Sequence, residues 1–187
     1  MSVEKDDLWQ ALLRTGEAVA SEEDYEHGYK REVRQDLRQY VAFRVAAESY
    51  AVSIQDVEEI SKLFETTPVP RTAAFLLGIG NVRGRIMPVV DLAHRLGLGE
   101  AEFGRAARVL IVERGDEPYG LVVDEVYGVV RIPPESMEER PGAIGGTRAD
   151  YIRALGRFES KIIIILELAE VLEPQDFVPR YKGDEGS

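Results

Sequence analysis

Apolar and polar residues alternate in short runs through the middle of this 187-residue chain, from about residue 39 to residue 173. In the first run, Val41, Phe43 and Val45 alternate with small or charged neighbours. This period of two is typical of strands with one buried face, and closely spaced turns are typical of barrels and sandwiches. No helical stretch recurs between the runs, which disfavours a parallel α/β sheet. The pattern predicts a mainly β fold of about nine or ten strands with three short helices.

The segment 80–84, Gly-Asn-Val-Arg-Gly, predicts a tight turn between two strands. The second strand ends at Asp91, whose carboxylate is suited to cap a short helix that Gly97 terminates. Arg83 lies within the turn, between apolar strands. Two interpretations of Arg83 stay open at this point: a solvated turn residue, or an interface arginine, a residue type enriched in binding hot spots.

Two other segments carry less regular patterns. Ile54, Val57 and Ile60 recur at helical spacing, so we expect a short helix or a strand-helix junction in SIQDVEEISK. The run YGLVVDEVYGVVRI, which ends at Ile132, predicts the return of a hairpin, and Asp124 ends an alternating strand within it. The last strands, YIRALGRF and KIIIILEL, are followed by a short helix that Pro174 ends.

The two ends of the chain differ in texture from the middle. Residues 1–38 are acidic and carry helical spacing near Leu8 and again over about residues 22–37, which predicts a helical N-terminal extension. That extension either packs weakly on the body or docks a partner. Residues 174–187 contain turn formers without a period, so we expect a loosely held tail.

Composition limits the classes of function. Lys and Arg number 23 against 34 Asp and Glu, and the net charge of −11 argues against nucleic acid and anionic membranes as partners. Cys is absent and only His27 and His94 occur, so we expect no disulfide and no metal site. No membrane-spanning run or signal peptide is recognisable, so direct membrane insertion is not expected and the predicted location is the cytoplasm.

No catalytic set is recognisable. The spacing of Gly78, Gly80 and Gly84 departs from a dinucleotide fingerprint, and a strand follows where a helix should begin. Of the acid pairs Asp124-Glu125 and Glu138-Glu139, Asp124 has no nucleophile nearby in sequence, and Ser136, close to the second pair, lacks the context of a nucleophile elbow. His27 only faintly echoes a phosphotransfer histidine, since the region is too short for a four-helix bundle. We therefore predict a protein with no catalytic residues and no cofactor.

The segment GIGNVRGRIMPVVDL resembles the signature of the CheW family, the adaptors of bacterial chemotaxis arrays. Three further segments are similar to the family in order and spacing: YVAFRVAAESYAVSIQDVEEI, YGLVVDEVYGVV and YIRALGRFESKIIIILELAEVL. The resemblance covers about residues 39–173, with a CheW-like domain flanked by 1–38 and 174–187. Residues in register with the signature are Gly78, Asn81, Arg83, Gly84, Ile86, Pro88, Val89, Asp91 and Leu92.

The resemblance implies two interlocked five-stranded SH3-like β-barrels with a shared core. It also implies a non-enzymatic adaptor that couples the cytoplasmic tip of chemoreceptors to the regulatory domain of a CheA-like histidine kinase. Receptor-binding positions carried over from the family are Asn81, Arg83, Gly84 and Val122. Kinase- or partner-binding positions are Val57, Glu59 and Ile60.

Three features depart from the family: the long N-terminal extension, Ala154 in place of a common glycine, and Glu159-Ser160 at a turn. They keep a second hypothesis open, a CheW-like paralogue that binds the kinase in a specialised or competing pathway without a receptor. An enzyme or small-ligand binder on a β-barrel body is a third class. Loss of receptor association by an Arg83→Glu variant separates the first hypothesis from the second.

Overall fold

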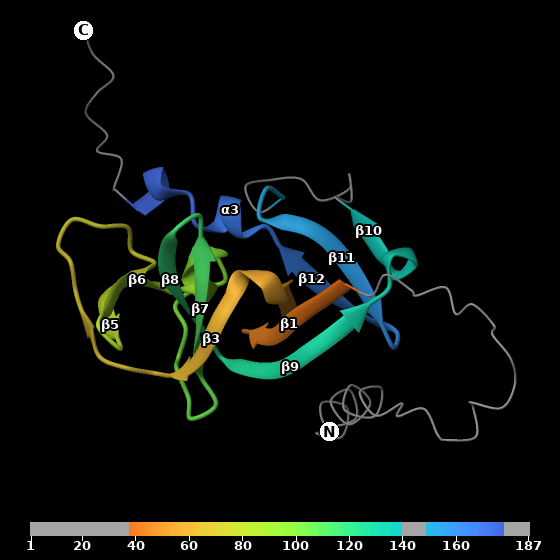
Figure 1. The fold of residues 1–187 in the computed structure, drawn as a ribbon, viewed down its shortest axis with the longest axis horizontal. Helices are drawn as coiled ribbons and strands as arrows, with labels where there is room; N and C mark the ends of the chain where they lie inside the picture. Colours follow the sequence, from red (N-terminus) through yellow and green to blue (C-terminus); the bar gives the residue numbers. More distant parts are fainter. Residues whose placement is uncertain (1–37, 140–148, 178–187) are drawn as a thin grey trace, which may run out of the picture.

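The computed structural model describes residues 38–139 and 149–177, in which strands are the main secondary structure (Figure 1). The first sheet has the order β10-β11-β12-β2-β1-β9 and the second has the order β3-β7-β8-β6-β5-β4. The first contains β1 (Arg38–Val45), β2 (Glu48–Ser53), β9 (Glu125–Ile132), β10 (Met137–Glu139), β11 (Ile152–Phe158) and β12 (Lys161–Leu166). The second contains β3 (Val57–Lys62), β4 (Thr66–Thr67), β5 (Leu76–Val82), β6 (Arg85–Asp91), β7 (Arg108–Arg114) and β8 (Glu117–Val123).

Short helical turns join or close the sheets. They are α2 (Leu92–Arg95), α3 (Leu168–Val171) and the 3₁₀ turns η3 (Ile54–Asp56), η4 (Pro134–Ser136) and η5 (Pro174–Phe177). The Asp91 carboxylate accepts a hydrogen bond from the His94 N–H at 3.1 Å, and Gly97 follows with φ of 70°. The cap and terminator predicted for this helix are therefore confirmed. The helices expected in the N-terminal extension lie outside the described residues.

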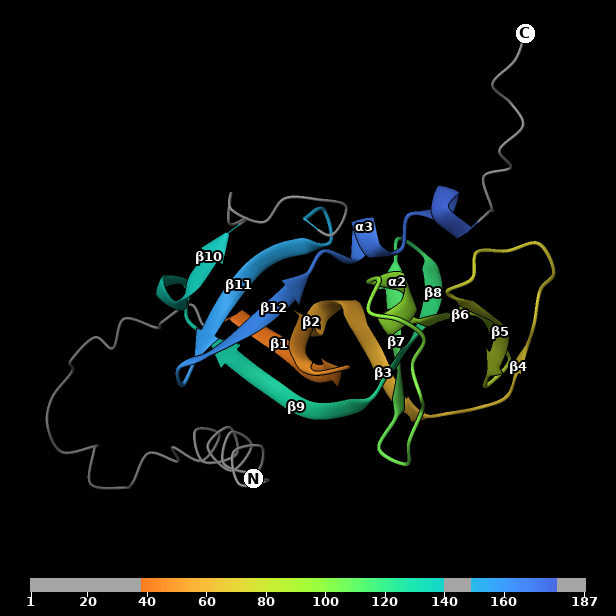
Figure 2. The same ribbon diagram turned by 180° about the vertical axis from the view of Figure 1, so that it is seen from behind.

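The chain crosses between the sheets twice, so the two units are interlocked. It leaves the first sheet through η3 and returns at Asp124, whose N–H donates to the Arg44 carbonyl at 3.0 Å. Neighbouring strands pair antiparallel except β12 with β2 and β6 with β8. Figure 2 shows both sheets curling, and we refer to them as the first and second barrels.

Three apolar clusters account for the core of the described residues. One fills the first barrel with side chains of β1, β2, β9, β11 and β12, among them Tyr40 and Ile163. One fills the second barrel, with Met87 and Val122. The third lies between the barrels and includes Phe43, fully buried. The predicted mainly β fold with a shared core is confirmed.

Each sheet has six strands where five were expected. The additional members are short: β4 has two residues and β10 has three. An alternation of period two cannot be recognised over so few residues, because β4 consists of two threonines and β10 has a single apolar side chain, Met137.

Two predicted segments differ in part from the structure. The strand-helix junction expected in residues 53–62 is found where β2 leads into η3, but residues 57–62 form β3, which pairs with β7, and not a helix. The strand expected to end at Asp124 is β8, which ends at Val123, but the residues that follow form β9 in the other barrel and not a continuation of the same hairpin. In both places the residues have one face toward the inter-barrel core, so burial from a second direction obscures the local period.

The C-terminal tail begins later than expected. Residues 174–177 form η5, and the Phe177 ring contacts Phe75 and Tyr119 with centroid distances of 5.3 and 5.7 Å. Arg95 holds the same region to the second barrel, because its guanidinium donates to the Val171 carbonyl at 2.6 Å and pairs with Asp176 at 2.6 Å. Residues 178–187 lie outside the described part of the chain.

Candidate functional site

Arg83 is held on a two-residue turn between β5 and β6. Both turn residues have positive φ, 53° at Arg83 and 83° at Gly84, which defines the type I′ turn suited to the twist of a hairpin. The Asn81 side-chain oxygen accepts a hydrogen bond from the Gly84 N–H at 2.9 Å and fixes the turn. A left-handed conformation costs about 1–2 kcal/mol for a residue with a Cβ. Backbone strain of this kind clusters at functional sites, which favours a binding role for Arg83.

The Arg83 side chain connects the residues predicted to bind the receptor with those predicted to bind the kinase. Its guanidinium pairs with the Glu59 carboxylate on β3 at 3.0 Å. The arginine remains 79% exposed while the glutamate is 29% exposed, so the ion pair lies at the surface with the cation outermost. A pair this exposed contributes at most about 1 kcal/mol to the stability of the fold, and the Arg83 guanidinium stays accessible at the surface.

A second arginine extends the same surface. Arg85 on β6 bonds to Glu58 and, at 3.2 Å, to Glu113 on β7. The hydrogen bond that the Arg85 guanidinium donates to Glu58 raises the pKa of that guanidinium, which therefore stays charged. Register along β3 shifts between Val57 and Glu59, so Glu58 is an extra residue in a bulge. A bulge re-aims side chains, which explains how two successive glutamates both contact arginines near one edge of the barrel.

Exposed apolar side chains flank these ion pairs. Ile60 on β3 is 43% exposed and Ile86 on β6 is 68% exposed. Together the residues form what we call the β3–β6 surface: Glu58, Glu59, Ile60, Arg83, Arg85 and Ile86. Sequence analysis missed Glu58, Arg85 and Ile86 as members. The signal that could have identified Ile86 is its position inside the signature segment, on the strand that follows Arg83.

The other predicted site residues differ in how far their side chains are exposed. Asn81 and Gly84 are exposed, whereas Val57 is half-buried and packs against the inter-barrel core. Val122 is 2% exposed and packs inside the second barrel. Its side chain faces the barrel interior in this structure, and the assignment of Val122 to receptor binding stays a prediction.

We expect a Gly84→Ala substitution to lower the free energy of unfolding by about 1 kcal/mol, because alanine must adopt φ of 83°. No atom lies within 4 Å of the added Cβ, so backbone strain is the sole cost. Urea unfolding measures it. Gly104→Ala is a matched control, since that Cβ also meets nothing within 4 Å and the position has no positive φ. Equal stability losses in both variants would contradict the turn geometry.

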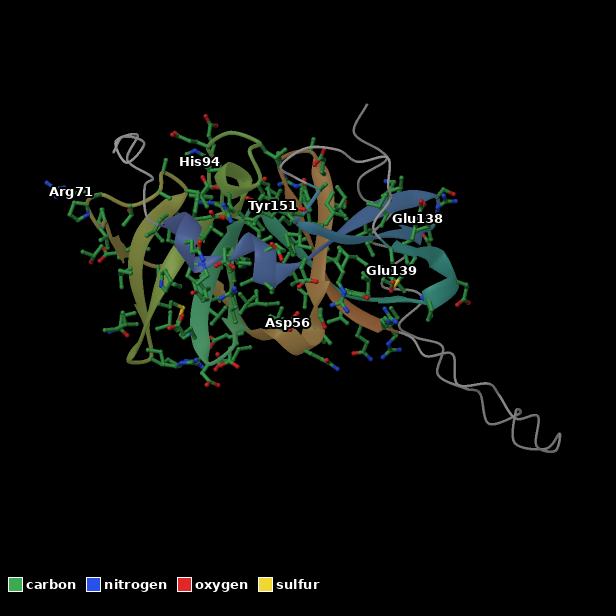
Figure 3. The ribbon with its side chains drawn as sticks, turned by 90° about the horizontal axis from the view of Figure 1, so that it is seen from above. Asp56, Arg71, His94, Glu138, Glu139 and Tyr151 are labelled. Carbon is green, nitrogen blue, oxygen red and sulfur yellow. The ribbon has the colours of Figure 1, made fainter. Side chains whose placement is uncertain are left out.

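Figure 3 shows that His94 lies far from the acid pair Glu138 and Glu139. The Asp124 carboxylate accepts from the Ala46 N–H at 2.6 Å and so fixes the β1–β2 turn. Glu139 pairs with Arg38 at 3.5 Å, and Glu138 lies 4.0 Å from Arg157. His94 lies on α2, across the molecule from Glu138 and Glu139. Among the described residues no group of three potential metal ligands occurs.

The fold and the β3–β6 surface together define a class of protein: a β domain of two barrels that carries a surface patch of charged and apolar side chains. A family model described as the CheW-like domain matches residues 39–175. The chain belongs to the CheW-like domain family. None of the helices in the described residues has the length and apolar character needed to cross a membrane.

Individual relatives agree with this assignment. The chain is similar to the chemotaxis protein CheW of Rhizobium meliloti, with 28% identity over 139 residues that cover 74% of this chain and 90% of that protein. It is 34% identical to protein FrzA of Myxococcus xanthus over 141 residues, 73% of this chain and 86% of that protein.

A solved structure extends the likeness to three dimensions. The scaffolding protein TtCheW from Thermoanaerobacter tengcongensis superimposes with a TM-score of 0.70 and 33% sequence identity. The match covers 77% of this chain and 98% of that one.

Proposed function

We propose that this chain is a non-enzymatic adaptor that couples the cytoplasmic tip of a chemoreceptor to a CheA-like histidine kinase. The observation that carries the proposal is Arg83, which is 79% exposed, held in a strained turn and paired with Glu59. Membership of the CheW-like family supports it, as does the likeness to a protein titled a scaffold. The site of action is the cytoplasm, at receptor arrays on the membrane.

The β3–β6 surface suits a protein partner better than a small substrate. Arginine and isoleucine side chains stand out from the barrel, and their ion pairs lie at the surface. An exposed apolar side chain beside a charged pair is the composition of an interface centre with a polar rim. β3 is also the end strand in the order of the second sheet, so one edge is open to a neighbouring strand.

Within this surface we assign Arg83 and Asn81 to the receptor, and Glu59 and Ile60 to the kinase. The Arg83–Glu59 ion pair then joins the two assignments directly, at 3.0 Å. An adaptor transmits the state of one partner to the other when it binds their alternative conformations with different affinity. The ion pair between Arg83 and Glu59 couples the two binding events directly, because a receptor that binds the Arg83 guanidinium leaves the Glu59 carboxylate without its partner.

Capture of partners from the native lysate by the full-length chain tests the proposal. Recovery of both a histidine kinase and a receptor supports the coupling adaptor. Recovery of the kinase alone supports the paralogue that serves a competing pathway. Recovery of neither overturns the proposed function.

We expect Ile60→Asp to weaken binding of the kinase regulatory domain about fivefold, because a charge replaces an apolar contact worth about 1 kcal/mol. Isothermal titration calorimetry with the isolated regulatory domain measures the change. Ile162→Asp is the matched control, since Ile162 is 58% exposed and lies on β12 in the other barrel. An equal loss in the two variants would show that Ile60 has no special part in kinase binding.

A further inference from the structure

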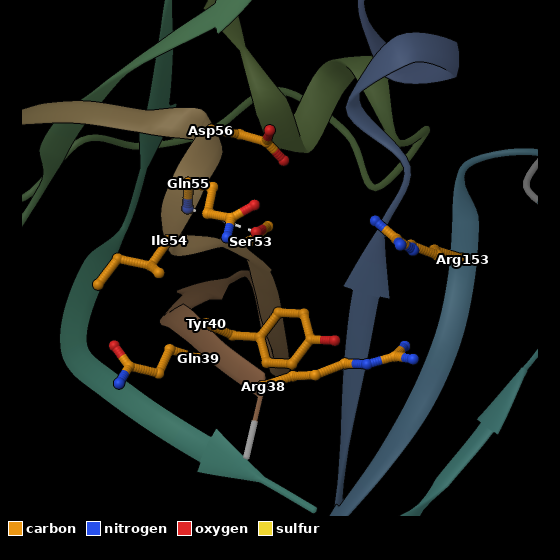
Figure 4. Close-up of a pocket in the computed structure, with 8 residues that line it drawn as sticks. All are labelled: Arg38, Gln39, Tyr40, Ser53, Ile54, Gln55, Asp56 and Arg153. Atoms are coloured by element: carbon orange, nitrogen blue, oxygen red, sulfur yellow. Dashed lines mark hydrogen bonds between the residues drawn. The ribbon is translucent and has the colours of Figure 1, made fainter. Parts of the chain in front are cut away.

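A polar cavity of about 470 Å³ lies at one end of the first barrel, away from the residues assigned above. Figure 4 shows its walls, formed by the start of β1, the turn from β2 into η3, and β11. Arg38 comes from β1 and Arg153 from β11, and their guanidinium groups lie on the same side of the cavity. Asp56, on η3, is the one carboxylate among its lining residues.

One of the two guanidinium groups in this cavity has no ion pair among the described residues. Arg38 pairs with Glu139 at 3.5 Å, with side-chain exposures of 44% and 74%. Arg153 takes part in none of the ion pairs of the described residues. Burial raises the pKa of the Asp56 carboxyl, Arg153 opposes that effect and Glu167 adds to it. The Arg153 guanidinium is therefore the group that has donors left for a further carboxylate.

Guanidinium groups from two different strands match carboxylate oxygens particularly well. Each planar guanidinium donates two parallel hydrogen bonds to a carboxylate, and two neighbouring guanidiniums accept a run of acidic side chains. The chemistry that fits is a short peptide with several carboxylates.

The chain itself carries such a peptide. Residues 1–37 contain five Lys or Arg and ten Asp or Glu, a net charge of 5 − 10 = −5. Four of the acids fall within five positions, at Glu22, Glu23, Asp24 and Glu26. Glu26 precedes Arg38, a lining residue of the cavity, by twelve residues, and twelve extended residues span at most about 40 Å. The connection is therefore long enough for the acids to reach back to the cavity.

We propose that the acidic segment 22–26 binds in this cavity of the same chain, with its carboxylates on Arg38 and Arg153. Covalent connection raises the effective concentration of the segment to the millimolar range, so even a weak contact is populated. The contact is electrostatic, and salt near 1 M, where the screening length is about 3 Å, weakens it.

Engineered cysteines in the full-length chain test the proposal cleanly, because the natural sequence contains no cysteine. Ser21→Cys precedes the acidic segment, and Gln55→Cys places a thiol on an exposed lining residue of the cavity. We expect mild oxidation to close an intramolecular disulfide in this pair about tenfold faster than in a control pair. The control combines Ser21→Cys with Arg71→Cys, a position that Figure 3 shows far from Asp56.

Charge variants show whether the arginines cause the proximity. Arg153→Glu should reduce the rate of disulfide formation to that of the control pair. Adding Glu22→Lys and Glu23→Lys to that variant should restore the rate of disulfide formation, since the new glutamate at position 153 then attracts two lysines of the segment. Asp56→Asn removes the competing carboxylate and should increase the rate.

Equal rates in the cavity pair and the control pair would overturn the proposal. Disulfide-linked dimers whose yield rises with protein concentration, without the intramolecular product, would also overturn it, because the segment would then belong to a second copy. Failure of the charge reversal to restore the rate would show that proximity does not depend on Arg153. Circular dichroism of each variant verifies that the β fold is retained.

Discussion

Replacing Arg95 with alanine should lower the free energy of unfolding by about 3–5 kcal/mol. The Arg95 side chain is 6% exposed and donates to the carbonyls of Val171 at 2.6 Å and Glu170 at 3.2 Å. It also lies against the rings of Phe75 and Tyr151, 4.7 and 4.8 Å from their centroids. The substitution removes all of these contacts at once and leaves buried carbonyls without this donor.

Urea unfolding followed by circular dichroism measures the effect. Arg157→Ala is the control, since that arginine is 76% exposed and lies 4.0 Å from its acidic neighbour. We expect it to change stability by less than about 0.5 kcal/mol. Arg95→Lys keeps the charge but loses the planar guanidinium, and its loss in the free energy of unfolding should lie between those of Arg95→Ala and Arg157→Ala. A loss below about 1 kcal/mol in Arg95→Ala would contradict the proposed role of this side chain in holding α3 and η5.

Replacing Arg83 with glutamate should weaken receptor association about thirtyfold, while the fold is retained. The reason is twofold: the exposed cation is lost, and the new carboxylate lies beside Glu59 and repels it. Thirtyfold corresponds to about 2 kcal/mol, the range of an interface hot spot. The measurement is co-sedimentation of the variant with receptor-containing membranes over a range of protein concentrations.

Arg71→Glu provides an unusually close control for that experiment. Arg71 is also an exposed arginine with positive φ, 61° compared with 53° at Arg83, and it has no ion pair among the described residues. Any general effect of net charge or of glutamate in a left-handed turn is therefore common to both variants. Equal receptor binding by Arg83→Glu and the natural chain would refute the assignment of Arg83.

Features encoded by neighbours in sequence were predictable. The Asp91 cap, the turn around Arg83 and the alternating strands each depend on residues a few positions apart, and all were recovered. The family signature then supplied the two-barrel arrangement, which alternation alone leaves open between barrel and sandwich. Arg83 itself stood out in the sequence because it lies in a turn between two apolar strands.

Features that depend on distant residues were not predictable. The bulge at Glu58 becomes visible only when β3 is paired with β7, so the convergence of two glutamates on Arg83 and Arg85 had no local signal. The burial of Val122 was missed because β8 has neighbours on both faces. Arg95 looked like an ordinary helical arginine, since its partners Glu170, Val171 and Asp176 lie more than seventy positions away.

The double crossing of the chain sets an order in which the molecule is able to form during translation. All six strands of the second barrel lie in one continuous stretch, residues 57–123, whereas the first barrel needs strands from both sides of that stretch. β2 must wait for β12, its parallel partner, which leaves the ribosome more than a hundred residues later. At about 5–20 residues per second that interval lasts several seconds. During it the edges of β1 and β2 that later pair with β9 and β12 are without those partners, and unpaired strand edges are prone to aggregation.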